Sequence, residues 1–479
     1  MRIRFWKSVS ASVLAVILIT GCQKMTDEHN EISDGSLNRN LVKLIEETPD
    51  LSTFAGYLQQ TGYDKELASS KSYTVFAPVN SALTGLDPSI INTPAKLKKF
   101  VGNHIALLQY RTTSITQPTR IAMLSEKYNN MLGTKIEDAT ITTADKYASN
   151  GLLQVLNKML PALDNCWEFM SNNALAPTKQ SAFMQSLFRN VFDTTNAIVI
   201  GVNPNTGDPI YQAGTDSVFT NLFWNRVHDL RDEKKQFTYF MLVNTAWDQE
   251  VNKFSPFFQT STPDSTTMTA SWNVVKDFAV DTVYDPATIP DTIFSKSGTK
   301  VGIDKTAIVT TVKTSNGVIY IMNKLDVQPL HKFKTYLIQA ENYTATSNDR
   351  RNNTYFRDRF NPVSGKDFRD VLVLNHGVAL FNIRYEITEM PKLKYKAYWV
   401  ALNDFQTATF TQKLGIGTAT SATFNYTTVA LNDFSEVYIG EFTTPRYWPK
   451  YDIFLTAANS TTAAANPLVC DYIKLVPGL

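Results

Sequence analysis

The sequence predicts a mixed α+β protein in which one fold of helices and strands occurs twice in tandem and an antiparallel β-sandwich follows. Two observations lead to this prediction. Two stretches in the first part of the chain each have a similar partner later on, in the same order and at nearly the same separation. From residue 333 onward, the helical spacing of apolar residues disappears and short runs typical of strands follow one another.

The repeated stretches form two matching pairs. The first pair is YTVFAPVNSAL at residues 73–83 and FTYFMLVNTAW at residues 237–247, which share Thr, Phe, Val, Asn and Ala at equal places. The second pair is SNGLLQVLNK at residues 149–158 and SNGVIYIMNK at residues 315–324. Two matches in the same order at nearly the same spacing indicate a tandem repeat of a single fold.

Each first stretch has the composition of a buried strand that ends in a turn. In the first copy, Pro78 cannot donate to a β-ladder, so we expect the strand to end there. Asn80 then suits the N-cap of a following helix. In the second stretch, Gly151 can supply the positive φ of a tight turn. Phe76 and Phe240 occupy equal places, and we expect both to be buried core residues.

These stretches resemble the two sequence boxes of the fasciclin (FAS1) domain family. Residues 74–83 are similar to the first box, TVFAPTNEAF, and residues 150–160 and 316–325 are similar to the second box, NGVIHVIDKVL. The resemblance extends over residues 37–330. It implies helices packed on a β-wedge and a role in adhesion or protein binding.

The second copy departs from the family pattern at two places. Met241 and Leu242 replace the Ala-Pro of the first box, and this copy lacks the histidine that the family often has between the boxes. In the first copy His104 takes that place, on the apolar face of a predicted helix. A lone histidine in such a position is usually a hydrogen-bonded core residue, so we expect His104 to have a core role rather than a ligand-binding one.

The N-terminus has the pattern of a lipoprotein signal. A positively charged start is followed by an apolar run at residues 13–19 that is too short to span a bilayer. The run ends in Ile-Thr-Gly-Cys, which resembles a bacterial lipoprotein box, and the resemblance implies lipidation of Cys22. An ordinary secretion signal with an incidental cysteine is the alternative. Residues 23–31 are similar to the acidic signals of Bacteroidetes-type surface lipoproteins, so we expect a lipid-anchored protein exposed on the outer membrane.

These patterns divide the chain into five parts. They are a signal peptide (1–21), a lipidated flexible tether (22–36), a first fasciclin-like domain (37–163), a divergent second one (164–330) and a C-terminal jelly-roll-like β-sandwich (331–479). Within the second copy, a Gly-, Pro- and Asn-rich insertion at residues 201–217 predicts a hairpin or loop. A Ser/Thr-rich stretch at residues 256–269 predicts a long exposed loop.

Charge, motifs and cysteines narrow the classes of function. The net charge is +2 and no basic stripe is present, so nothing favours nucleic acid as a partner. HExxH, GxSxG, P-loop, GxGxxG and CxxC motifs are absent from the sequence, and we therefore expect a protein that is not an enzyme. Apart from Cys22, the cysteines are Cys166 and Cys470, which fall in different predicted domains. We expect two buried thiols, and a disulfide bridge is the alternative.

The predicted sandwich begins and ends with runs that have a known counterpart. Residues 338–343 and 470–475 resemble the first and last strands of jelly-roll carbohydrate-binding modules. In those modules the opening acidic residue often helps to hold a structural calcium ion. The resemblance places Glu341 and Asp471 at the matching positions, so a structural calcium is the one cofactor that the sequence suggests.

The candidate ligand-binding residues are mostly aromatic and lie in the predicted sandwich. Tyr398 and Trp399 are on one predicted strand, and Arg446, Tyr447 and Trp448 are in a predicted loop between two prolines. Exposed Trp and Tyr rings offer flat apolar faces to sugar rings or peptide side chains, while their polar tips hydrogen-bond. We expect Trp448 to be the most exposed. The alternative is that these rings form the core of the sandwich.

Together these features predict a non-enzymatic surface lipoprotein. Its first candidate function is adhesion or protein and ligand binding, which the fasciclin resemblance implies. The alternative is a glycan- or nutrient-binding accessory lipoprotein beside an outer-membrane transporter complex, which the sandwich and its aromatic residues suggest. An unrecognised hydrolase is the third hypothesis, because a glycosidase needs only two carboxylates from anywhere in the chain.

Overall fold

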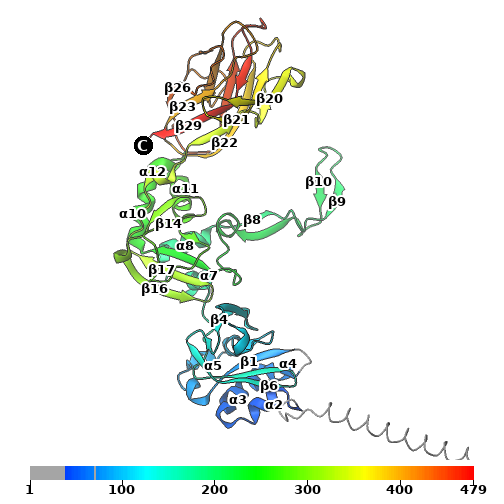
Figure 1. The fold of residues 1–479 in the computed structure, drawn as a ribbon, viewed down its shortest axis with the longest axis vertical. Coiled ribbons are helices and arrows are strands. Elements are labelled where there is room, and N and C mark those ends of the chain that lie inside the picture. Colours follow the sequence, from blue (N-terminus) through cyan, green and yellow to red (C-terminus); the bar gives the residue numbers. More distant parts are fainter. Residues whose placement is uncertain (1–37, 69–71, 479) are drawn as a thin grey trace, which may run out of the picture. The chain divides into compact units, whose positions relative to one another are not determined.

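The computed structural model describes residues 38–68 and 72–478 (Figure 1). These residues form two compact units. One runs to Glu168 and includes two short later segments, Arg231–Gln236 and Lys313–Gly317, and the other contains the rest of the described chain. Both helices and strands occur, as the sequence predicts. The predictions for the signal peptide, for Cys22 and for the tether lie outside the described residues.

The first unit contains a seven-stranded sheet and a group of helices. Its helices are α2 (Leu41–Glu46), α3 (Ser52–Thr61), α4 (Tyr63–Leu67), α5 (Pro88–Ile91) and α6 (Pro94–Gly102). In sheet order its strands are β2 (Ile105–Ala106), β1 (Tyr73–Pro78), β7 (Gly151–Leu156), β6 (Ala139–Ala148), β5 (Lys135–Ile136), β4 (Tyr128–Leu132) and β3 (Thr119–Ala122). The two repeated stretches of the first copy thus become the neighbouring strands β1 and β7.

Strands β1 and β7 run parallel and are buried on both faces. Every residue of both strands is buried. Tyr73 and Val75 belong to the core cluster that includes the helices, whereas Phe76 belongs to a second cluster, with Ile121 and Met131. A strand buried on both faces needs a continuous apolar run rather than an alternating one. This is why the sequence of the first stretch is so uniformly apolar.

The turn that leads into β7 requires glycine. Gly151 has φ +152°, and a Cβ atom there would lie 2.1 Å from the carbonyl oxygen of Tyr73, to which the strand pairs. The predicted positive φ is therefore confirmed, and close backbone approach is a second reason for glycine at this place. Strand β1 also ends at Pro78, as expected.

The second sheet has the strand order β13-β12-β17-β16, which corresponds to β2-β1-β7-β6 of the first. Its strands are β12 (Phe237–Leu242), β13 (Ala279–Val280), β16 (Ile308–Thr314) and β17 (Gly317–Met322). The helices in this part of the chain are α7 (Cys166–Asn172), α8 (Thr178–Ser186), α9 (Leu222–Arg226), α10 (Asn244–Phe254), α11 (Pro263–Val275) and α12 (Pro329–Lys332). A short hairpin of β14 (Thr292–Phe294) and β15 (Lys300–Gly302) adds to them. Phe240 is completely buried, as is Phe76, so the prediction for both residues is confirmed.

The asparagines of the repeated stretches cap helices that begin elsewhere in the chain. We expected Asn80 to cap the helix that follows it, and this prediction is wrong. Its Oδ1 instead accepts a hydrogen bond from the backbone N–H of Thr53 at the start of α3, at 2.9 Å. Asn244 does the same for Lys179 in the first turn of α8, at 3.0 Å. In the second pair of stretches, Asn150 caps α2 and Asn316 caps α7, each at 2.9 Å. These bonds satisfy helix N–H groups that have no partner within their own helix.

Residues 188–221 form an arm of two short ribbons (Figure 1). One ribbon pairs β8 (Phe188–Phe192) with β11 (Ser217–Asn221), and the other pairs β9 (Val199–Val202) with β10 (Pro209–Tyr211). The hairpin that the sequence predicts at residues 201–217 is confirmed, with Gly207 at φ +77° in its turn. Several large apolar side chains of the arm are exposed, among them Ile200 and Phe219.

The Ser/Thr-rich stretch at residues 256–269 is not a long loop. It contains the start of α11, where Thr262 caps the helix and Pro263 is its first residue. The hydroxyl groups of Thr266 and Thr269 donate to carbonyl oxygens four residues earlier, at 2.8 and 2.7 Å. Hydroxyl side chains can bond to the helix backbone in this way, so their abundance did not prevent a helix.

The C-terminal region consists of strands that pair antiparallel in three sheets. The first sheet is β18 (Tyr336–Gln339), β29 (Tyr472–Gly478), β23 (Lys394–Val400) and β26 (Val437–Thr443). The second is β19 (Ala345–Thr346), β22 (Asn382–Met390), β27 (Trp448–Ala457), β24 (Phe410–Ile416) and β25 (Thr427–Val429). The third is β20 (Thr354–Asn361), β21 (Lys366–Val373) and β28 (Leu468–Cys470).

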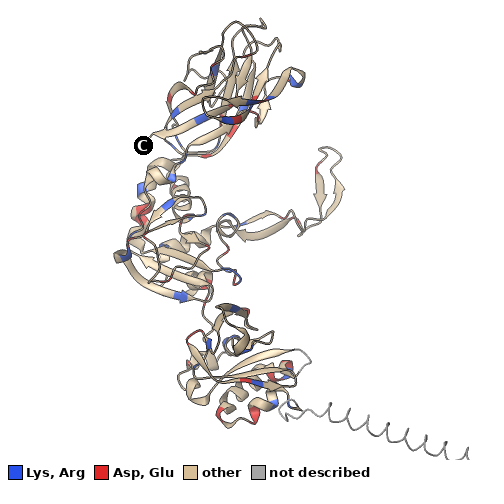
Figure 2. Ribbon diagram, in the orientation of Figure 1, with Lys and Arg blue, Asp and Glu red and all other residues tan. Residues whose placement is uncertain are grey.

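Both cysteines of the described chain are free and buried, which confirms the prediction of two thiols. Burial raises the pKa of the Cys166 thiol to about 12, so this group stays protonated. Basic and acidic residues are interspersed within each unit (Figure 2). None of the helices in the described part of the chain has the length and hydropathy needed to cross a bilayer.

Candidate functional site

The structure divides the predicted aromatic residues of strand β23 between two faces. Trp399 is only 1% exposed and lies in the core, together with Tyr395. Tyr398 is half-buried, with its ring 5.3 Å from that of Tyr438 and the Lys474 Nζ 4.9 Å from its centroid. Successive residues of a strand point to opposite faces. Trp399 is therefore a core residue, and its assignment to a ligand site is wrong.

The segment around Trp448 is not an exposed loop. Trp448 is the first residue of β27, is half-buried and pairs with Met390. The Arg446 guanidinium lies over its ring at 4.1 Å, and the Tyr451 ring lies 5.3 Å away. Because these two side chains already contact the indole, it does not offer the free platform that the sequence predicted.

Tyr447 is buried by contacts with residues that are distant in the sequence. Its backbone N–H donates to the Gln259 carbonyl at 2.7 Å, and its ring lies 5.8 Å from that of Phe258. Phe258 in turn contacts Phe333. The predicted ligand-binding loop therefore covers an apolar cluster from a distant part of the same unit, and the prediction for Tyr447 is wrong.

A different aromatic surface is exposed on β20, the edge strand of the third sheet. Phe356 and Phe360 are 45% and 58% exposed, and their even spacing places them on one face of the strand. The ring of Tyr343 stacks on Phe356, with centroids 6.4 Å apart and planes 9° apart. The Arg369 guanidinium lies 5.8 Å from the Phe356 centroid. We call Tyr343, Phe356, Phe360 and Arg369 the aromatic face.

Ion pairs on the opposite side of β20 hold the strand in place. Arg357 donates to Asp370 on β21 at 2.8 Å and to Asp404 at 2.6 Å. Arg359 forms an ion pair with the second oxygen of Asp404. Burial raises the pKa of Asp370, and the Arg357 guanidinium opposes that effect. Two arginines bound to partly buried carboxylates fix β20 more firmly than exposed pairs would.

Sequence reasoning did not single out the aromatic face, although a signal was present. The run Tyr-Phe-Arg-Asp-Arg-Phe at residues 355–360 combines aromatic residues with charge at the neighbouring positions. Because neighbouring residues of a strand face opposite sides, the paired Arg357 and Arg359 lie on one face, and Phe356 and Phe360 lie on the other beside Asp358. The charges hide the apolar alternation on which strand prediction depends.

The two calcium candidates do not form a metal site in the described residues. Burial, and then the neighbouring carboxylates of Asp370 and Glu341, raise the pKa of Asp471 to about 7. These carboxylates are therefore close enough to repel one another. Yet nowhere in the described chain do three or more His, Cys, Asp or Glu side chains form a group that could hold a metal ion. The described residues thus supply no such group around Glu341 and Asp471.

His104 is a core residue, as we expected. Its Nδ1–H donates to the Phe100 carbonyl, and its Nε2 accepts from the Leu160 N–H, both at 2.9 Å. Burial lowers its pKa to about 4. The imidazole is neutral and uses both nitrogens within the fold, which leaves neither for a ligand.

Comparisons with known proteins found one family model and several solved structures that are similar to parts of the chain. Residues 49–162 match the model of the Fasciclin domain. The chain is similar to a FAS1 domain pair from the insect cell adhesion molecule fasciclin I, with 12% identity over 60% of this chain and 100% of that one, at a TM-score of 0.26. No curated protein matches the sequence.

Two carbohydrate-binding modules are also similar to part of the chain. One is the CBM36-1 domain of a multidomain xylanase from the hindgut metagenome of Trinervitermes trinervoides, with 15% identity over 30% of this chain and 99% of that one, at a TM-score of 0.22. The other is a family 35 module from Clostridium thermocellum, with 13% identity over 30% of this chain and 100% of that one, also at a TM-score of 0.22.

Proposed function

We propose that the protein is a non-enzymatic, lipid-anchored surface protein that binds a glycan chain through the aromatic face of its C-terminal region. The observation that carries the proposal is that face, where Phe356 and Phe360 are exposed beside Arg369 on an edge strand. Flat rings can stack on the apolar faces of sugar rings, and a guanidinium can donate to their hydroxyl groups. Adhesion to a protein is the second candidate, and the Fasciclin domain match at residues 49–162 favours it.

The aromatic face suits an extended ligand better than a small one. Phe356 and Phe360 are four residues apart on a strand, so their Cα atoms lie about 13 Å apart. The Asp358 carboxylate and Arg369 lie between them, with 3.7 Å between their nearest charged atoms. A chain of sugar units can contact both rings and hydrogen-bond to the polar pair between them.

We expect the double variant Phe356→Ala/Phe360→Ala to lose at least about five-fold in affinity for any glycan that the wild-type protein binds. Each lost ring contact contributes about 0.5–1.5 kcal/mol beyond area burial, and 1.4 kcal/mol corresponds to ten-fold in affinity. A glycan array would identify the ligand, and isothermal titration calorimetry would measure the dissociation constants.

Tyr438→Ala is the matched control for this experiment. Tyr438 is an equally exposed aromatic residue, 51% exposed, but lies on β26 in another sheet. It should retain wild-type affinity. Equal binding by the double variant and the wild type would contradict the aromatic face as the site. Binding of proteins but of no glycan on the array would favour adhesion instead.

We further propose that residues 37–163 and 164–330 are two copies of one fasciclin-like fold. The shared strand order of their sheets supports this proposal, as do the four helix-capping asparagines at matching sequence positions. A neighbouring transporter complex would then take up the captured glycan.

Replacing Cys22 with alanine should release the protein from the membrane. Cys22 is the proposed lipidation site, and none of the helices in the described chain can span a bilayer. The variant should appear as uncleaved or soluble precursor, whereas metabolic labelling with a fatty acid should mark only the wild type. A variant that remains in the membrane fraction after a high-salt wash would show that another anchor exists.

A further inference from the structure

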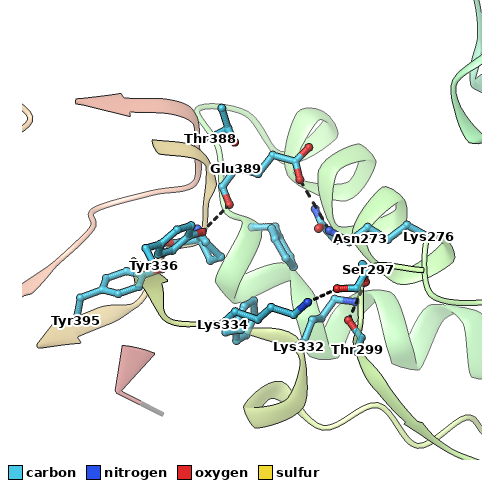
Figure 3. Close-up of a pocket in the computed structure, with 13 residues that line it drawn as sticks. Asn273, Lys276, Ser297, Thr299, Lys332, Lys334, Tyr336, Thr388, Glu389 and Tyr395 are labelled. Atoms are coloured by element: carbon cyan, nitrogen blue, oxygen red, sulfur yellow. Dashed lines mark hydrogen bonds and ion pairs between the residues drawn. The ribbon is translucent and has the colours of Figure 1, made fainter. Parts of the chain in front are cut away.

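A pocket with an excess of positive charge lies between α11, the β14–β15 hairpin and the C-terminal strands (Figure 3). Its volume is about 220 Å³, and all of its lining residues belong to one compact unit. The side chains of Lys276, Lys332 and Lys334 line it together with Asn273, Ser297 and Thr299. Three of the lining side chains are therefore cations.

The acidic residues near the pocket are already engaged by other cations. Asp277 forms a buried ion pair with Lys332. Glu389 binds Arg226, with 2.6 Å between Oε1 and Nη2, and its second oxygen lies 3.9 Å from the Lys276 Nζ. Lys334 donates to the backbone carbonyl of Ser297 rather than to a carboxylate. Four cations therefore face two carboxylates, which leaves a net charge of about +2 in this part of the unit.

Lys276 is the buried cation of this group that lacks a close carboxylate partner. Its side chain is only 19% exposed, and its one ion pair in the described chain is the long contact with Glu389. Burial and then the charge of Lys332 lower its pKa to about 8, so the ammonium form predominates at neutral pH at a cost in free energy. An anion in the pocket would remove that cost, because it would supply the missing counter-charge in a region of low dielectric constant.

We propose that this pocket binds an oxyanion, a carboxylate, sulfate or phosphate group, with the Lys276 Nζ as its main counter-charge. The Lys334 Nζ and the hydroxyl groups of Ser297 and Thr299 are the neighbouring polar groups. The volume is large enough for several small polar molecules, and none of the lining residues belongs to the aromatic face. The site is therefore separate from the aromatic face, and its existence does not depend on the proposed glycan-binding function.

Phosphate, sulfate and citrate are the probes for the first test. At pH 7 and constant ionic strength, at least one of them should raise the melting temperature of the full chain in a saturable manner, whereas sodium chloride should not. Binding to the folded state alone stabilises a protein in proportion to ln(1 + [L]/Kd). The three probes distinguish a phosphate or sulfate site from a carboxylate site. No shift with any probe, beyond that with chloride, would overturn the proposal.

Lys276→Met should weaken the binding of the anion and raise its apparent dissociation constant at least ten-fold. The matched control is Lys305→Met, which removes the same charge from a half-exposed residue outside the pocket and should leave the constant unchanged. An unchanged constant in Lys276→Met would also overturn the proposal.

A measurement on the wild-type protein covers the case in which Lys276→Met does not fold. Acetylation by acetic anhydride can be followed at each lysine by mass spectrometry. The bound anion should slow the labelling of Lys276 several-fold and leave Lys305 unaffected. Equal slowing at both lysines, or at neither, would contradict an anion site at Lys276.

Discussion

Replacing Phe76 with alanine is expected to lower the free energy of unfolding of the first sheet by about 3–5 kcal/mol. Phe76 is completely buried and packs in a cluster with Ile121, Met131 and Leu156. Phe76 and Leu156 lie on β1 and β7, two strands that are buried along their whole length, so the cavity cannot collapse easily. Phe240→Ala should have a similar cost in the second sheet, where Phe240 is equally buried and its ring lies 5.9 Å from that of Tyr320.

Hydrogen exchange is the suitable measurement, because it reports the stability of each sheet separately. Phe76→Ala should speed the exchange of the buried strand β7 and leave that of β17 unchanged, and Phe240→Ala should do the opposite. Phe294→Ala is the control, since this phenylalanine is 66% exposed and should cost less than about 0.5 kcal/mol. Equal effects of all three substitutions would contradict a core role for Phe76 and Phe240.

The sequence was sufficient to predict the strands of the repeated stretches. Strand β1 is buried on both faces, so its apolar run is continuous and easily recognised. The role of the asparagines could not be predicted in the same way. Asn80 caps helix α3, which begins 28 residues earlier at Ser52. Asn150 caps helix α2, which begins 109 residues earlier at Leu41. Local sequence shows the capping residue but not its distant partner.

The exposure of two candidate ligand-binding residues, Trp399 and Tyr447, was predicted wrongly for a related reason. Tyr398 and Trp399 are adjacent in sequence, but the alternation of a strand sends Trp399 into the core. Tyr447 is buried because the Phe258 ring lies 5.8 Å away, and this contact joins residues 189 positions apart. Exposure of an aromatic residue depends on such partners. The pocket at Lys276 was missed for the same reason, because its lysines are unremarkable in sequence.

Breaking the buried ion pair beside the pocket should have an equally large effect. The Lys332 ammonium and the Asp277 carboxylate are almost fully buried, and Asp277 also accepts hydrogen bonds from Ser295 and Ser297, both at 2.6 Å. Lys332→Met would leave the carboxylate without a cation, and we expect it to cost about 3–5 kcal/mol. The double variant Lys332→Met/Asp277→Asn removes both charges and should recover a large part of that loss.

The pH dependence gives this last prediction its sharpest test. Burial alone would raise the pKa of Asp277. The charge of Lys332 and the hydrogen bonds from the two serine hydroxyls nevertheless hold this pKa below its ordinary value. A carboxyl with a lowered pKa stabilises the fold above its unfolded-state pKa of about 3.9, and this contribution is lost as the pH falls through the folded-state pKa. In Lys332→Met the carboxyl lacks that cation and should take up its proton at higher pH. The stability difference between wild type and Lys332→Met, measured by denaturant unfolding, should therefore shrink as the medium is acidified. A difference that stays constant from pH 7 to pH 3 would show that the cost of Lys332→Met arises from lost packing rather than from an unpaired carboxylate.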